Sequence, residues 1–201
     1  MTGASGVVYG VRLLEVLGDV DDVETHLVIS GSARRTLTVE TGYTAKQVAM
    51  LADVTYRVGD IGAALASGSF RTDGMVVVPC TIKTLSGIAN SYAENLLQRA
   101  GDVALKDRRP LVLVVRETPL HLGHLRLMTQ VTEMGAIVMP PVPAFYHHPE
   151  RIEDIIDHTV SRLLDLLDIE LEEDLVPRWP GGADLEAEAP SPVVGAAPAW
   201  T

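Results

Sequence analysis

Residues 111–119 have the sequence Leu111-Val112-Leu113-Val114-Val115-Arg116-Glu117-Thr118-Pro119. The five apolar residues predict a strand that is buried on both faces, which is typical of a parallel sheet. A cation and a carboxylate follow this strand directly. Because ligands of open parallel sheets bind where the strands end, Arg116 and Glu117 indicate a site for phosphate chemistry with proton transfer.

Other strands and helices alternate along the chain on both sides of this run. Further strands are predicted at residues 25–30, 75–79 and 136–139. Helices are predicted, from apolar residues at helical spacing, at residues 7–17, 33–41, 61–66, 84–89, 94–108, 121–134 and 150–167. The alternation predicts an α/β fold with parallel strand pairing and right-handed crossovers.

The first residues, Met1-Thr2-Gly3-Ala4-Ser5-Gly6, lead straight into a helical pattern. A glycine-rich turn that opens a helix ordinarily follows a strand, and two residues are too few for one. We therefore expect an apolar strand of about five residues upstream of Met1, so that the first strand is truncated in this sequence.

Composition limits the class of protein. The 201 residues suit one domain over 1–180, and residues 181–201, rich in Pro, Ala, Gly and Glu, predict a disordered tail. The net charge is −11, with no basic stripe for nucleic acid. No secretory signal and no bilayer-spanning run is present. The single Cys80 excludes an internal disulfide and a multi-cysteine zinc site. These features favour a cytoplasmic protein without a metal or membrane partner.

Small hydroxyl residues follow two more predicted strands, at Ser30 and in the stretch Thr81-Ile82-Lys83-Thr84. The turn 3–6 can present backbone N–H groups to a phosphate, with the Ser5 hydroxyl beside them. The repetition indicates one crevice lined by the carboxyl ends of the sheet. The alternative is purely structural: a tight turn with Ser5 as N-cap, and capping of a helix by Thr81.

Several charged and aromatic residues have two interpretations. Arg99 and Lys106 lie on a predicted helix, where most charged side chains are solvated. Glu117 is either an ion-pair partner or a general acid/base. Tyr146 either packs a loop or donates its hydroxyl to a phosphate.

Two further candidates favour a structural role. His121 and His124 are three residues apart, but no His-Glu-x-x-His pattern accompanies them, so a surface pair is favoured over a metal site. Cys80 follows a buried strand, where a thiol is more often inert than nucleophilic.

Taken together, the motifs resemble the UbiX-type flavin prenyltransferases, over about residues 2–180. The stretches that carry the resemblance are Thr2-Gly3-Ala4-Ser5-Gly6, Cys80-Thr81-Ile82-Lys83-Thr84-Leu85, Asn95-Leu96-Leu97-Gln98-Arg99-Ala100, Leu105-Lys106-Asp107-Arg108-Arg109, Arg116-Glu117-Thr118-Pro119-Leu120 and Pro143-Ala144-Phe145-Tyr146. Thr81 stands where Ser is commoner in the family, which preserves the hydroxyl.

The resemblance implies a three-layer, flavodoxin-like fold with a Rossmann-like parallel sheet. It implies reduced FMN as a bound substrate, dimethylallyl monophosphate as the donor, and no metal. The product would be FMN prenylated at N5 and C6, for use by a UbiD-type decarboxylase. It also implies a homododecamer with active sites where subunits meet.

The resemblance also implies roles for individual residues. The expected FMN-binding residues are Gly3, Ala4, Ser5, Ser30, Thr81, Ile82, Lys83, Thr84 and Arg116. The residues expected to hold the prenyl phosphate are Arg99, Lys106, Tyr146 and Arg162. The expected catalytic residues are Glu117, which protonates the departing phosphate, Ser5 with Glu40, which relay the N5 proton, and Lys106. The candidates for an apolar wall around the allylic cation are Trp179, Trp200, Tyr92 and Phe145.

Two other functions compete with this one. A decarboxylase of peptidyl-cysteine-like substrates would need a catalytic histidine near the second helix, whereas His26 falls in a predicted strand. A non-enzymatic flavin-binding subunit of a decarboxylase complex would not need an acid beside the cation at Arg116. The sequence leaves open whether the donor is a monophosphate or a diphosphate.

Overall fold

The computed structural model describes residues 1–179 and 181, so the predicted tail lies almost wholly outside the described residues. Its strands are all parallel and form two groups. β1 (His26–Val28) pairs with β2 (Val54–Tyr56), and β3 (Met75–Cys80) pairs with β4 (Leu111–Val115), which pairs with β5 (Ile137–Val138). The α/β class and the parallel pairing predicted from the sequence are confirmed.

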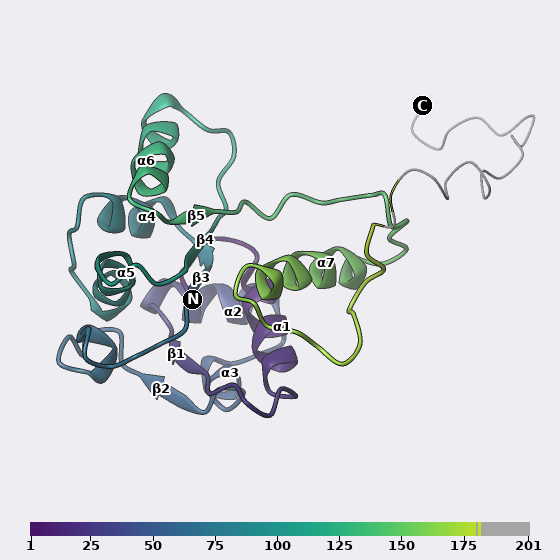
Figure 1. Ribbon diagram of the computed structural model, residues 1–201, viewed down its shortest axis with the longest axis horizontal. Coiled ribbons are helices and arrows are strands. Elements are labelled where there is room, and N and C mark those ends of the chain that lie inside the picture. The colour runs from purple at the N-terminus through teal and green to yellow at the C-terminus, as the bar shows by residue number, and fades with distance from the viewer. Residues whose placement is uncertain (180, 182–201) are drawn as a thin grey trace, which may run out of the picture.

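Helices cover both faces of the β3–β5 group (Figure 1). One face packs against α1 (Val7–Leu17) and α7 (Ile152–Asp165). The other packs against α4 (Ile82–Ala89), α5 (Leu96–Lys106) and α6 (Leu122–Glu133). A third cluster joins α1 and β1 to α2 (Gly31–Glu40) and α3 (Ala45–Ala49). The result is the expected three-layer architecture.

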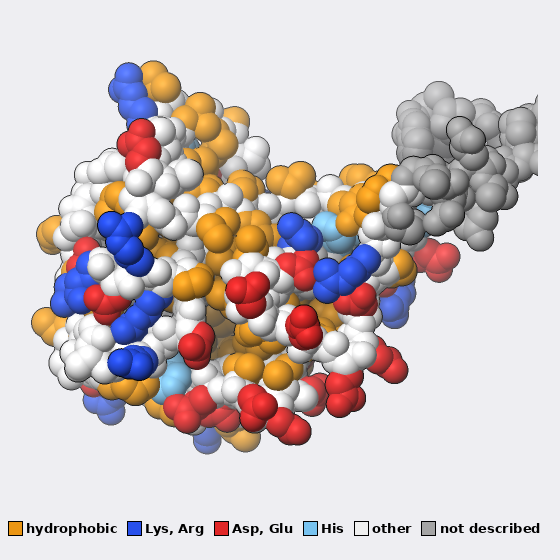
Figure 2. All heavy atoms as spheres, viewed as in Figure 1, with side chains coloured by type: hydrophobic (Ala, Val, Ile, Leu, Met, Phe, Trp, Pro, Cys, Tyr) orange, Lys and Arg blue, Asp and Glu red, His pale blue; other side chains and the backbone are white. Residues whose placement is uncertain are grey.

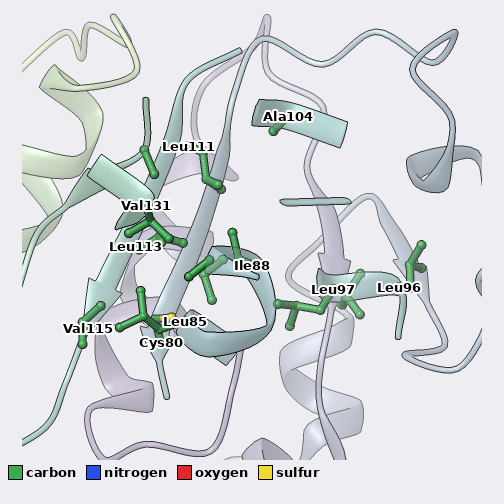
Figure 3. Packing of buried hydrophobic residues seen from close by; sticks show 14 residues of the cluster. Cys80, Leu85, Ile88, Leu96, Leu97, Ala104, Leu111, Leu113, Val115 and Val131 are labelled. Carbon is green, nitrogen blue, oxygen red and sulfur yellow. The ribbon is translucent and has the colours of Figure 1, made fainter. Parts of the chain in front are cut away.

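Strand β4 lies at the centre of the core, and all five of its residues are buried. Leu111, Leu113 and Val115 face the helices of the α4–α6 side, whereas Val112 and Val114 face α1 and α7. Figure 3 shows the first set beside Leu85 and Ile88 of α4. Because successive side chains of a strand point to opposite faces, a continuous apolar run is what a strand between two helical layers requires.

The structure contains two elements that were not predicted from the sequence, α3 and β2. Both are short, and β2 is held by tertiary contacts. It pairs with β1, and the Asp53 carboxylate just before it accepts hydrogen bonds from Thr25 N and Oγ1, both at 2.7 Å. The predicted helix 61–66 was also wrong in extent: only a single 3₁₀ turn forms, η1 (Ala64–Ala66).

Residues Met1 and Thr2 lie between the two groups of strands. Met1 N donates to Val28 O (2.8 Å), Ser30 N donates to Met1 O (3.1 Å), and Thr2 N donates to Pro79 O (3.2 Å). A cavity of about 670 Å³, lined by β1, β3, α1 and α5, extends from Met1 between these strands. A strand upstream of Met1 stays a prediction.

Gly10 lets α1 approach β3 closely, and Gly10→Val is expected to destabilise the fold. A Cβ at this position would lie 2.8 Å from the Val78 carbonyl oxygen and 2.4 Å from Met1 Cε. Backbone must move to relieve the first contact, so we expect a loss of about 3 kcal/mol, at the upper end for overpacked cores. Urea unfolding measures it, with Gly42→Ala as the control, since nothing lies within 4 Å of that position. Equal midpoints for Gly10→Val and wild type would contradict the close packing.

Candidate functional site

Loops from distant parts of the sequence meet at the carboxyl edge of the strands. Thr2, which is buried, joins two of them: its Oγ1 donates to Pro79 O (2.7 Å) and accepts from Thr81 N (2.8 Å). Thr36 Oγ1, on α2, donates to Gly3 O (3.3 Å). The turn 3–6 therefore lies between α2 and the start of α4, which is consistent with the predicted crevice. Thr2 directly precedes the glycine-rich turn, and no role for its side chain was predicted from the sequence.

Hydroxyl side chains cap the helices that start at this edge. Ser30 Oγ accepts from Ala33 N (3.1 Å) at the start of α2. Thr81 Oγ1 accepts from Thr84 N (3.2 Å) and donates to Thr84 Oγ1 (3.1 Å) at the start of α4. The capping role of Thr81 is thus confirmed, and it does not exclude a ligand, because a helix start leaves further N–H groups unpaired and carries partial positive charge.

Ile82 and Lys83 do not direct their side chains to a common site. Ile82 packs against the apolar core, and Lys83 Nζ pairs with Glu94 Oε2 at 3.0 Å on the surface. Any contribution that these two residues make to anion binding therefore comes from their backbone N–H groups in the first turn of α4.

The start of α1 is capped by a residue from α2. Its N-cap is Gly6, with φ of 96° and no side-chain cap of its own, so the N-cap role considered for Ser5 was wrong. Instead, Glu40 Oε2 accepts from Gly6 N (2.8 Å) and Val7 N (3.3 Å). A carboxylate already satisfies this helix start, which leaves the starts of α2 and α4 for a phosphate. Ser5 is exposed beside Glu40.

Arg116 and Glu117 lie at the same edge. Arg116 N donates to Cys80 O (3.2 Å), which places this residue next to Thr81. Both side chains are exposed, and Glu117 Oε1 accepts from Thr118 N (3.1 Å). No salt bridge within residues 1–179 involves either residue, so the structure gives no support to Glu117 as an ion-pair partner. Arg116 therefore lies next to the start of α4, where a guanidinium is suited to an anionic ligand.

Arg99 and Lys106 lie elsewhere. Arg99 Nε donates to Ala66 O (3.1 Å) and Nη1 pairs with Asp102 (2.8 Å), while Lys106 pairs with Asp107. Lys106 ends α5 shortly before β4 begins, and Arg116 follows the end of β4. Five residues of strand put these two positions about 15 Å apart along the sheet. The structure therefore does not bring Lys106 to Arg116 within one protomer.

Tyr146 and Arg162 belong to the opposite side of the sheet. Tyr146 Oη lies 2.9 Å from His158 Nε2 on α7, and Arg162 Nη1 pairs with Asp165 Oδ2 at 2.6 Å on the same helix. Helix α7 packs on the face that α5 does not cover. The four residues expected to bind the prenyl phosphate thus form two pairs on two faces. His158, for which no role was predicted from the sequence, precedes Arg162 by one helical turn.

Large apolar side chains are exposed near this second pair. The segment between β5 and α7 extends away from the sheet before α7 returns (Figure 1), and it exposes Val142 (69%) and Phe145 (67%). Ile152 at the start of α7 is 73% exposed. Figure 2 shows apolar side chains on this segment and on α6, with basic side chains gathered around α5. Exposed apolar patches of this kind mark interaction surfaces.

The residues considered for an apolar wall do not enclose a space within one protomer. Tyr92, Phe145 and Trp179 are exposed, and Trp200 lies outside the described residues.

Cys80 is buried at the end of β3, and its thiol is expected to be unreactive. Burial raises its pKa to about 12, so almost no thiolate forms near neutral pH. We expect no labelling by iodoacetamide at about pH 8 in the folded protein, and complete labelling after unfolding in urea. Mass spectrometry of the intact chain checks this. Rapid labelling of the folded protein would contradict the buried position.

The rings of His121 and His124 are in contact, with centroids 3.6 Å apart and planes tilted by 33°. In the described part of the chain, no group of three or more His, Cys, Asp or Glu side chains is arranged to hold a metal ion. No helix among the described residues has the length and apolar character needed to cross a membrane.

Comparison with known proteins gives consistent matches over most of the chain. The family model described as "Flavoprotein" matches residues 1–164. The flavin prenyltransferase UbiX of Escherichia coli (strain K12) is 62% identical over 181 residues, covering 90% of this chain and 96% of that protein. The flavin prenyltransferase UbiX of Thauera aromatica is 55% identical over 186 residues, covering 92% and 94%.

Solved structures of related proteins also match most of the chain. A crystal structure of AnUbiX (PadA1) in complex with FMN and dimethylallyl pyrophosphate has a TM-score of 0.87 and 49% identity, covering 90% of this chain and 95% of that one. A dodecameric FMN-dependent UbiX-like decarboxylase from Escherichia coli O157:H7 has a TM-score of 0.86 and 48% identity, covering 90% and 100%. The peptidyl-cysteine decarboxylase EpiD has a TM-score of 0.57 at 15% identity and covers 83% and 93%, a likeness that shows the fold alone.

Proposed function

Because the chain belongs to the UbiX flavin prenyltransferases of the Flavoprotein family, we propose that it transfers a dimethylallyl group from dimethylallyl monophosphate to N5 and C6 of reduced FMN. The observation that carries this proposal is the convergence of Arg116, Glu117 and the starts of α2 and α4 at one edge of the sheet.

The FMN phosphate is assigned to the starts of α2 and α4. Ser30, Thr81 and Thr84 shape these helix starts, and the backbone N–H groups of Ile82 and Lys83 lie in the first turn of α4. Arg116 supplies the positive charge. The turn Gly3-Ala4-Ser5 is assigned to the flavin ring, because the Glu40 carboxylate already caps α1 and would repel a phosphate there.

The reaction exchanges one bond for another at the prenyl carbon. The carbon–oxygen bond of the donor breaks, the phosphate departs with the electron pair, and the carbon bonds to N5, which loses its proton. In the ring closure that follows, one carbon of the prenyl double bond takes up a proton and the other bonds to C6, which releases its hydrogen as a proton. Fixed cations lower the energy of the charge that develops on the phosphate. Arg99, Lys106 and Arg162 are assigned this role, and Tyr146 adds a hydrogen bond.

Proton transfers are assigned to the acids at the sheet edge. Glu117 gives a proton to the departing phosphate, as a positioned acid can. Ser5 and Glu40 accept the proton that N5 loses. Glu40 is suited to this because Gly6 N and Val7 N hold its carboxylate beside the turn that carries Ser5.

The donor site is proposed to form between copies of the chain. Arg99 with Lys106, and Tyr146 with Arg162, occupy opposite faces of one protomer, so a single copy cannot close around one small phosphate. Exposed Val142, Phe145 and Ile152 next to Tyr146 supply an apolar surface for a second copy. A dodecamer, like that of the UbiX-like relative, would provide such contacts. The product is proposed to pass to a UbiD-type decarboxylase. The protein itself is proposed to be located in the cytoplasm.

The mass of the flavin extracted after the reaction distinguishes a prenyltransferase from a flavin-binding subunit. We expect incubation of the purified protein with reduced FMN and dimethylallyl monophosphate to yield a flavin heavier by one dimethylallyl unit, by mass spectrometry of the extract. Parallel incubation with the diphosphate identifies the preferred donor. Bound FMN of unchanged mass with both donors would favour a flavin-binding subunit and overturn the proposal.

A further inference from the structure

Tyr146 is fixed against α7 by a cluster of aromatic rings. Its Oη lies 2.9 Å from His158 Nε2, and the two rings meet edge-on at a centroid distance of 5.6 Å and 79°. Trp179 meets the Tyr146 ring from another direction, at 5.4 Å and 80°. Because edge-to-face contacts restrict ring orientation, the phenol of Tyr146 has a defined direction although the residue is 43% exposed.

His158 is itself held in place on α7. The ring of His147 stacks on it at 5.0 Å with an interplanar angle of 6°. Burial lowers the pKa of His158, and the nearby His147 and Arg162 lower it further. The imidazole is therefore neutral near pH 7, and one of its two nitrogens carries a proton.

The tautomer of this neutral ring decides what Tyr146 can do. If His158 Nε2 accepts the hydrogen bond, the Tyr146 hydroxyl donates its only proton to the imidazole, and only its lone pairs remain for other partners. If His158 Nε2 donates, the phenol oxygen is the acceptor and its own O–H remains available to another acceptor. Arg162 follows His158 by four residues, so it lies on the same side of α7. Only the second arrangement gives Arg162 a neighbouring donor for an anion.

We propose that His158 is a positioning residue that donates Nε2–H to the Tyr146 oxygen and thereby directs the Tyr146 hydroxyl proton at the phosphate of the prenyl donor, beside Arg162. This inference rests on the proposed function, because it assumes that Tyr146 and Arg162 bind that phosphate. It adds a residue that touches neither the donor nor the flavin but decides whether the phenol can donate.

Steady-state kinetics of His158 variants test the proposal. His158→Leu removes the donor, and we expect the KM for dimethylallyl monophosphate to rise about tenfold, the effect of one hydrogen bond to a charged group. The dissociation constant for FMN stays unchanged. His158→Gln, whose amide places an N–H near the position of Nε2, restores most of the affinity. His148→Asn is the matched control, since His148 is exposed and has no role in this cluster.

A double-mutant cycle shows whether His158 acts through Tyr146. In the Tyr146→Phe background, His158→Leu should change the donor KM by less than about twofold, because no hydroxyl remains to be directed. Additive losses would overturn the positioning role, and so would a wild-type KM in His158→Leu. If His158→Leu fails to fold, His158→Asn is used in its place. The amide of the asparagine reaches the position of Nδ1 instead of that of Nε2, so it cannot donate to Tyr146. Equal KM values for the Gln and Asn variants would then overturn the proposal.

The reaction of the wild-type protein distinguishes a failure of the proposed function from a failure of the positioning role of His158. If the wild-type protein forms no prenylated flavin, the proposed function fails and the role of His158 fails with it. If the wild-type protein forms prenylated flavin and the His158 variants behave as wild type, only the positioning role is overturned.

Discussion

Glu117→Gln is expected to slow turnover about 100-fold or more, the usual contribution of a positioned acid or base, while FMN binding is unchanged. The substitution keeps the size of the side chain and its carbonyl oxygen, so the hydrogen bond from Thr118 N is preserved. It removes the proton that the departing phosphate needs. Arg116, which is assigned to the FMN phosphate, stays in place.

Two measurements check this prediction. Flavin mass spectrometry under single-turnover conditions gives the rate, and titration with FMN gives the affinity. Glu133→Gln is the control, because Glu133 is an exposed acid at the end of α6, away from the sheet edge. Turnover at the wild-type rate in Glu117→Gln would remove Glu117 from the mechanism.

Lys106→Ala and Arg162→Ala are each expected to lower turnover on the order of 100-fold, and the two variants are expected to restore activity to each other when co-expressed. Each removes a cation that stabilises the departing phosphate. If α5 of one copy and α7 of another form the donor site, random mixing leaves roughly a quarter of the sites with both cations intact. Activity should recover to about that fraction.

The matched control for complementation pairs Lys106→Ala with Arg99→Ala. Both substitutions lie on α5, so every site in that mixture lacks one cation and no recovery is expected. Equal recovery in the two mixtures, or none in the first, would contradict a donor site shared between copies. Size-exclusion chromatography of each variant confirms that the assembly is preserved.

The sequence was sufficient to predict the elements with a strong local signal. The apolar runs of β3 and β4, bounded by turn residues, predict parallel strands between helical layers, and all five residues of β4 are buried. The position directly after a strand identified Ser30, Thr81 and Arg116 as neighbours at one edge. This works because parallel strands end on the same side of a sheet, whatever the rest of the chain does.

Short elements lacked such a signal. β2 has three residues, and its pairing with β1 is accompanied by hydrogen bonds between Asp53 and Thr25, which are 28 residues apart in the chain. The cap of α1 likewise comes from Glu40 rather than from the adjacent Ser5. A local pattern cannot reveal a hydrogen-bond partner that tertiary packing supplies.

By itself, then, the sequence determined the layer architecture and, through its motifs, the family, and it indicated the edge of the sheet to which the chemistry is assigned. Only the tertiary structure decided how the basic residues are divided. Arg99 and Lys106 lie on the face covered by α5, and Arg162 lies on the face covered by α7, with Tyr146 held against it by His158. The spacing of residues along the chain determines on which side of its own helix each residue lies. The face of the sheet on which that helix packs depends instead on the burial of apolar side chains from the whole molecule.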